Sequence, residues 1–119
     1  MKKTLAALVV AVAMLSLTGS ALAATAGQRN AVSSAQDYLD YQAFSKSGLI
    51  KQLKFEHFSG SDARYAVNHI RVNWNAQAVK SAKDYLDYQS FSRSGLIGQL
   101  EFEGFTHSQA AYGVSKAYH

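Results

Sequence analysis

The 119-residue sequence contains no cysteine and no proline. The absence of cysteine excludes disulfides and thiolate metal ligands, which many small exported domains use to compensate for a small core. No stretch alternates apolar and polar residues over the length of a typical strand, and neither a glycine-rich phosphate loop nor a basic stripe occurs. The fold must therefore rely on packed helices and on aromatic side chains, of which there are seven Tyr, six Phe and one Trp.

Two copies of one segment make up most of the chain. Asp37–Gln42 recurs as Asp84–Gln89, and Ser47–Ile50 recurs as Ser94–Ile97, at a constant offset of 47 residues. A fixed period of this length indicates tandem copies of one structural unit. A residue that differs between the copies cannot be essential to the architecture of the unit, whereas a shared residue belongs to the fold or to a common surface.

Residues 1–23 have the layout of a secretory signal peptide. Lys2 and Lys3 precede an apolar run, and the small residues Ala21 and Ala23 mark a cleavage site before Ala24. The run is shorter than the roughly 20 residues that a bilayer span needs. An uncleaved N-terminal anchor is the alternative, and it would be the one expected contact with a membrane. Cleavage would lower the formal charge from +4 to about +2.

The end of the apolar run resembles a lipoprotein signal that lacks its cysteine. In Leu17-Thr18-Gly19-Ser20, Ser20 stands where the lipidated cysteine would be. A serine hydroxyl cannot form the thioether that carries the diacylglyceryl group. The segment is either a former lipoprotein signal or an ordinary polar end of a signal peptide. Both interpretations predict an exported protein without a lipid, located outside the cell or in the cell envelope.

The apolar pattern predicts an all-α fold of two tandem three-helix units. We expect a tether at 24–30, a first unit at 31–72, a linker at 73–76 and a second unit at 77–119. Within each unit, apolar residues recur at helical spacing in three segments. The closely joined second and third helices resemble a helix-turn-helix. The single tryptophan, Trp74, is expected to pack between the units.

Polar residues at the helix starts predict where the helices begin. Asn30 and Asn75 are expected to cap the first helix of each unit, and Ser45 and Ser92 the second. The third helices carry the spacing of a capping box at 59–62 and 106–109.

Several apolar and glycine positions carry expectations of their own. Phe55 and Phe102 are assigned to the apolar side of the second helices. Gly48 and Gly95 are expected to let the first helix approach closely. Gly113 is expected to weaken the last helix, because glycine is a poor helix former.

No constellation of catalytic or metal-binding residues is evident. His57, His69, His107 and His119 lack the spacing of a zinc site. The repeated Asp pair at 37 and 40 is more typical of a solvated helix face than of acid–base catalysis. The third helix of the second copy lacks the Arg and Asn residues that read bases. We therefore predict no enzyme, no cofactor, no metal and no nucleic-acid partner.

A binding surface is the remaining candidate for function. Tyr41 and Tyr88 stand between polar residues and are the aromatic residues most expected to be exposed. Tyrosine is a common anchor at protein interfaces. The alternative is that both tyrosines merely cover the corner between the first and second helices. The predicted binding residues form two similar patches, Asp40, Tyr41 and Lys46 in the first unit and Asp87, Tyr88 and Arg93 in the second.

The repeated motif resembles the host cell surface-exposed lipoprotein family, also called Ltp-family lipoproteins. The resemblance runs from Ala35 to Val67 and again from Ala82 to Val114, and it includes the tryptophan-containing linker. It implies compact helix-turn-helix-like units outside the membrane. It also implies superinfection exclusion, in which a prophage-encoded protein stops an incoming phage from delivering its DNA by engaging a phage tail protein. Ser20 departs from the family, because the family is held at the membrane by a lipid.

Two functions therefore stay open at the level of sequence. The first is an exported, non-enzymatic binding protein that blocks phage DNA entry. The alternative is a general cell-envelope or secreted interaction module with a protein or cell-wall ligand. The sequence predicts neither the oligomeric state nor whether the two units form one binding surface.

Overall fold

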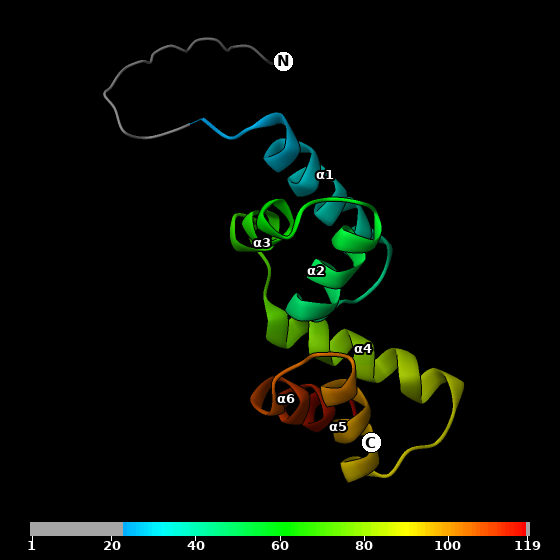
Figure 1. Cartoon of the computed structure of the whole chain (residues 1–119). Coiled ribbons are helices and arrows are strands. Elements are labelled where there is room, and N and C mark those ends of the chain that lie inside the picture. Colours follow the sequence, from blue (N-terminus) through cyan, green and yellow to red (C-terminus); the bar gives the residue numbers. More distant parts are fainter. Residues whose placement is uncertain (1–22, 119) are drawn as a thin grey trace, which may run out of the picture.

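The structure is a computed structural model that describes residues 23–118. The expected signal peptide up to residue 22, with Ser20, and His119 lie outside the described residues. Residues 23–118 contain helices and no strands, so the predicted all-α fold is confirmed. Figure 1 shows the units stacked end to end, α1–α3 above α4–α6. The helices are α1 (Ala26–Tyr41), α2 (Lys46–Phe55), α3 (Gly60–Asn68), α4 (Trp74–Tyr88), α5 (Arg93–Phe102) and α6 (His107–Ala117).

Each unit has a hydrophobic core of its own, built from the same positions. In the first unit, Leu49 and Leu53 of α2 are fully buried against small residues of α1 and α3. Leu96 and Leu100 of α5 take the same places in the second unit. Full burial of a leucine contributes about 1.5–3 kcal/mol. Alanines on the first and third helices let these helices pack closely around the leucines.

The chain becomes helical earlier than the sequence indicated. Thr25 caps α1 through a capping box: its hydroxyl accepts from the amide of Gln28 at 3.0 Å, and the Gln28 side chain accepts from the Thr25 amide at 2.9 Å. Asn30 lies inside the helix, where its side chain donates to the carbonyl of Ala26. The predicted cap at Asn30 was therefore wrong, and residues 26–30 of the expected tether are helical.

The predicted linker at 73–76 was also misplaced. Asn73, not Asn75, caps α4, and its side chain accepts from the Ala76 amide at 3.0 Å. Trp74 is the first residue of α4, yet its ring packs against the core of the first unit. The connection is therefore residues 69–73, and the predicted place of Trp74 between the units is confirmed.

The other predicted caps are present, with one difference. Ser45 and Ser92 cap α2 and α5, each accepting from the amide three residues on. Thr106 and Gln109 form a complete capping box at α6. At α3 only half of the predicted box is present. The Ser59 side chain accepts from the Asp62 amide, but the Asp62 side chain does not accept from the Ser59 amide.

The glycines early in α2 and α5 lie against the capping hydroxyls of their own helices. A methyl group at Gly48 would lie 2.8 Å from Ser45 Oγ, and one at Gly95 would lie 2.7 Å from Ser92 Oγ. The expected close approach of the first helix is therefore wrong, because the neighbour is the capping hydroxyl. Gly113 is different, since it is buried directly against Ala78 of α4. It serves the packing of α6 on α4, which the expectation of a weakened helix had missed.

Candidate functional site

The two units meet through the start of α2 and the end of α5. Ser45 Oγ donates to the carbonyl of Glu103 at 2.7 Å, and Ser47 Oγ donates to the carbonyl of Gly104 at 3.1 Å. The amide of Phe44 donates to Oε1 of Gln77 at 3.0 Å. Ser45 is buried by this contact, whereas its copy Ser92 is exposed. These bonds and the packing of the Trp74 ring join one unit to the other, and we call this contact the seam.

Gly104 makes the seam possible because it has no side chain. Its φ of +105° lies in the left-handed region, where glycine is favoured. A methyl group here would overlap Ser47 Oγ and lie 2.7 Å from Ser45 Oγ. In the first unit the same position is His57, also left-handed at φ 73°, but exposed. The difference between the copies at this position therefore follows the seam, which only the second unit's helix end enters.

A cleft lies beside the seam and contains part of the predicted site. We call it the seam cleft. Two of its residues come from the connection between α1 and α2, and the others from α4 and the end of α5. Carboxylates and tyrosine rings dominate its lining, which favours a basic or hydrogen-bonding partner over an anion. Its residues are Gln42, Ala43, Ser81, Asp84, Tyr85, Asp87, Tyr88 and Glu103.

The cleft alters the titration of Glu103. Burial raises the pKa of its carboxyl above the ordinary value of 4.5, and a hydrogen bond with Ser81 opposes part of that rise. The neighbouring carboxylates in the cleft are Asp84 and Asp87. The folded protein therefore holds the Glu103 proton more tightly than the unfolded chain does.

We expect this raised pKa to appear as a pH dependence of stability. A group whose pKa is raised on folding stabilises the protein below its unfolded pKa and loses that contribution as pH rises through its folded pKa. Glu103→Gln keeps the shape of the protonated acid at every pH. In urea unfolding between about pH 4 and pH 7, wild type should lose stability relative to this variant. Parallel curves for the two proteins would contradict the raised pKa.

The predicted tyrosines are on the surface. Tyr41 ends α1 and is 84% exposed, and Tyr88 ends α4 and is 88% exposed. Rings this exposed do not cover the corner between the first and second helices. Phe44 packs instead on Tyr38 in the first unit, and Phe91 packs on Tyr85 in the second. Both units thus expose a tyrosine at the same place, and tyrosine is a common anchor at protein interfaces. Their role in binding stays a prediction.

The charged members of the two predicted patches are exposed but do not pair. Among the described residues, neither Asp40 with Lys46 nor Asp87 with Arg93 forms an ion pair. Arg93 lies over the ring of Tyr118, 4.8 Å from its centroid. The two patches are therefore not equivalent.

The surroundings of the two patches differ as well. Asp87 and Tyr88 line the seam cleft together. Asp40 instead lines a hollow with Arg71, and Tyr41 lines another with Ser34 and Asp37. Only the second patch therefore combines an exposed aromatic with a concave surface between the units.

The two most exposed phenylalanines were missed in the sequence. Phe55 is 76% exposed and Phe102 is 85% exposed, at the ends of α2 and α5. Their assignment to the apolar side was wrong, because Phe55 follows the buried Leu53 by two residues, which is about 200° around a helix. That angle was readable from the sequence. Each unit thus exposes one tyrosine and one phenylalanine at helix ends.

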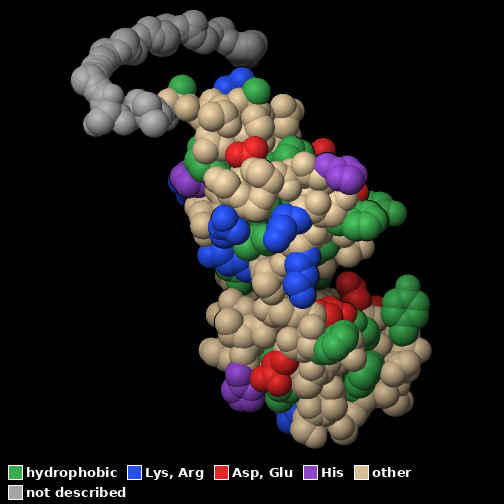
Figure 2. Space-filling view, viewed as in Figure 1, with side chains coloured by type: hydrophobic (Ala, Val, Ile, Leu, Met, Phe, Trp, Pro, Cys, Tyr) green, Lys and Arg blue, Asp and Glu red, His purple; other side chains and the backbone are tan. Residues whose placement is uncertain are grey.

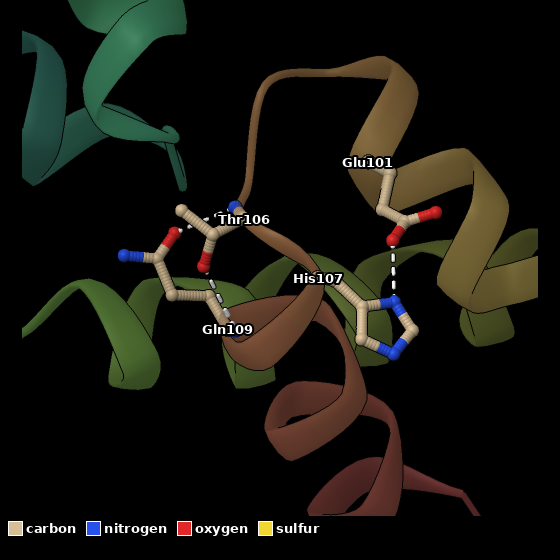
Figure 3. A network of polar contacts seen from close by, with 4 residues as sticks. All are labelled: Glu101, Thr106, His107 and Gln109. Carbon is tan, nitrogen blue, oxygen red and sulfur yellow. Dashed lines mark hydrogen bonds and ion pairs between the residues drawn. The ribbon is translucent and has the colours of Figure 1, made fainter.

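Figure 3 shows an exposed polar contact beside the start of α6. His107 Nδ1 lies 2.6 Å from Glu101 Oε2, and both side chains are open to solvent. The neighbouring Thr106 and Gln109 are engaged in the cap of α6. Among the described residues, no three His, Asp or Glu side chains gather as metal ligands. No helix in 23–118 is both long and apolar enough to cross a membrane.

The chain is similar to proteins of one family. The family described as host cell surface-exposed lipoprotein matches twice, at residues 27–70 and 73–116. A solved structure of Ltp, a superinfection exclusion protein from the Streptococcus thermophilus temperate phage TP-J34, is 35% identical with a TM-score of 0.73. The match covers 78% of this chain and 97% of that chain. No curated protein matches the sequence.

Proposed function

Because the chain belongs to the host cell surface-exposed lipoprotein family, we propose that it is an exported, non-enzymatic binding protein of the superinfection-exclusion type. Its action is to stop an incoming phage from delivering DNA into a cell that already carries this protein. The similarity to a phage exclusion protein extends over both units and the connection between them, which supports a shared mode of action.

One observation carries the proposal. Each unit holds a tyrosine and a phenylalanine almost wholly in solvent: Tyr41 and Phe55 in the first, Tyr88 and Phe102 in the second. The two cores do not use these rings, and both copies have them at the same places. Aromatic side chains are frequent anchors of protein interfaces. The partner we propose is a protein of the phage tail.

The seam cleft offers such a partner a concave surface. Tyr88 and Asp87 line it, and Asp84 and Glu103 add carboxylates beside the exposed ring. An extended segment with basic residues would satisfy these carboxylates while its apolar side chains cover the tyrosine. Lipid attachment is not required for this contact. We propose that the protein is cleaved before Ala24 and is not lipidated, since the chain has no cysteine.

Expression in a phage-sensitive host tests the function. We expect fewer plaques and less phage DNA inside the cells, with unchanged phage adsorption. A variant with Tyr41, Tyr88, Phe55 and Phe102 changed to Ser should lose most of the protection. Truncating one interface anchor costs about 2 kcal/mol, roughly thirtyfold in Kd.

The matched control replaces exposed polar residues of the same helices. Gln36→Ser with Lys83→Ser changes α1 and α4 at equivalent exposed places and should protect like wild type. Unchanged plaque counts across a panel of tailed phages, with the protein present outside the cell, would contradict the proposal. Retention of the exported protein by cell-wall fractions would then favour a general envelope interaction.

A further inference from the structure

The solvent-facing side of α2 carries two lysines beside an exposed phenylalanine. Lys51 and Lys54 are three residues apart and Phe55 follows Lys51 by four, so the three side chains share one side of the helix. Leu49 and Leu53 occupy the opposite side and are fully buried. Lys51, Lys54 and Phe55 are all exposed, and we call them the lysine–phenylalanine face.

The equivalent face of the second unit has the phenylalanine ring but no positive charge. Gly98, Glu101 and Phe102 stand at the three equivalent places in α5. The lysines are therefore not needed to build the unit. Figure 2 shows Lys and Arg side chains gathered on the first unit over α2 and α3, and fewer on the second unit in the same view. Neither lysine takes part in an ion pair within residues 23–118.

We propose that the lysine–phenylalanine face binds the surface of an anionic phospholipid membrane. Lysine ammonium groups are attracted to headgroup phosphates, and each contributes about a fivefold gain in partition near the surface. The ring of Phe55 enters the boundary between headgroups and acyl chains, while the lysine stems lie along it. A membrane surface presents charged headgroups above an apolar layer. Lysines beside an exposed ring match that arrangement better than they match a partner that offers charge alone.

The face gives a way to stay near the membrane without a lipid. The sequence alone had indicated membrane contact only through an uncleaved signal, and the exposure of Phe55 changes that expectation. An anionic cell-wall polymer offers charge but no apolar layer, so it would engage the two lysines and leave the ring in water. The contribution of Phe55 therefore separates the two kinds of surface. Vesicle binding is measured without phage, so the inference is tested separately from phage exclusion. In this inference Phe55 contacts the membrane, and Tyr41, Tyr88 and Phe102 remain exposed for a tail protein.

Co-sedimentation of the exported protein with vesicles tests the proposal. We expect binding to vesicles of phosphatidylcholine with one quarter phosphatidylglycerol, little binding to phosphatidylcholine alone, and release at high salt. Lys51→Gly with Lys54→Glu, which gives α2 the residues of α5, should weaken binding about thirtyfold or more. Phe55→Ser should weaken it at unchanged charge.

The reverse exchange is the matched control. Gly98→Lys with Glu101→Lys gives α5 the residues of α2 and should strengthen binding, since it creates a second face. Each exchange places residues that the other copy already holds, and Glu101→Lys also removes the exposed contact of Glu101 with His107. The fold of every variant is therefore checked by circular dichroism. Equal binding to neutral and anionic vesicles, or no loss in the Lys51→Gly, Lys54→Glu variant, would overturn the proposal. Retention on an anionic cell-wall polymer without vesicle binding would overturn it as well.

Discussion

Gly104→His should separate the two units. A side chain at this left-handed position strains the backbone by about 1–3 kcal/mol, and its first carbon would overlap Ser47 Oγ. Both serine-to-carbonyl hydrogen bonds of the seam would then be lost, at about 1 kcal/mol each. We expect a total loss of roughly 3–5 kcal/mol in the stability of the seam. Small-angle scattering should show a longer, more flexible particle than the Cα radius of gyration of 18.1 Å for residues 23–118 implies.

The first unit offers the matched control for this change. His57→Gly makes the opposite exchange at the equivalent helix end, where the residue is exposed and enters no seam. It should leave the scattering unchanged and raise stability by up to about 1 kcal/mol, because glycine relieves the positive φ. Ser47→Ala removes only one seam bond and should have an intermediate effect. If Gly104→His unfolds at the same temperature as wild type and scatters identically, the described seam is wrong.

Much of the fold could be predicted because the sequence contains two copies of one unit. The shared positions separated the buried leucines and the capping serines from the rest, and both sets are where the repeat placed them. The errors fall at helix ends. Asn30 and Asn75 looked like caps, but the capping box at Thr25 and the asparagine two residues earlier, Asn73, provide better partners for the free amides. Several polar residues in a row leave the start of a helix undetermined.

The seam was beyond the reach of the sequence for a different reason. Ser45 and Ser92 are identical in sequence and both cap a helix, yet only Ser45 also donates to the other unit. The path of the connection at 69–73 decides which unit contributes the start of its second helix to the seam and which contributes the end. The one readable sign was the exchange of His57 for Gly104, because a glycine at a left-handed helix end removes a side chain as well as strain.

The exposed aromatics show where a pattern was used too loosely. Tyr41 and Tyr88 were expected at the surface because polar residues flank them, and they are. Phe55 and Phe102 were assigned to the core because they are apolar and follow buried leucines, although helical geometry turns them to the other side. Of the four exposed rings, the two tyrosines were thus predicted from the sequence and the two phenylalanines were found in the structure.

Gly113→Ala should destabilise the second unit, even though alanine is the better helix former. The added methyl would lie 2.6 to 2.8 Å from the carbonyl carbon, carbonyl oxygen and Cβ of Ala78. Atoms of the α4 backbone cannot rotate away, so α6 must move outward and loosen the contacts of Val114. Overpacking of this kind costs about 1–3 kcal/mol or more, against a propensity gain of about 1 kcal/mol. We expect a net loss of about 1 kcal/mol, and up to about 2 kcal/mol, in urea unfolding.

Gly98→Ala makes the same chemical change where nothing opposes it. A methyl at Gly98 meets no atom within 4 Å, so only the propensity gain remains and stability should rise by up to about 1 kcal/mol. Ala66→Gly in the first unit completes the comparison. Ala66 stands at the place of Gly113 and is buried, so α1 and α3 already accept a methyl there, and its removal should destabilise. Opposite signs for Gly113→Ala and Gly98→Ala would establish that close packing of α6 on α4, not helix propensity, selects the glycine. A gain in stability from Gly113→Ala would show instead that these helices lie farther apart than described.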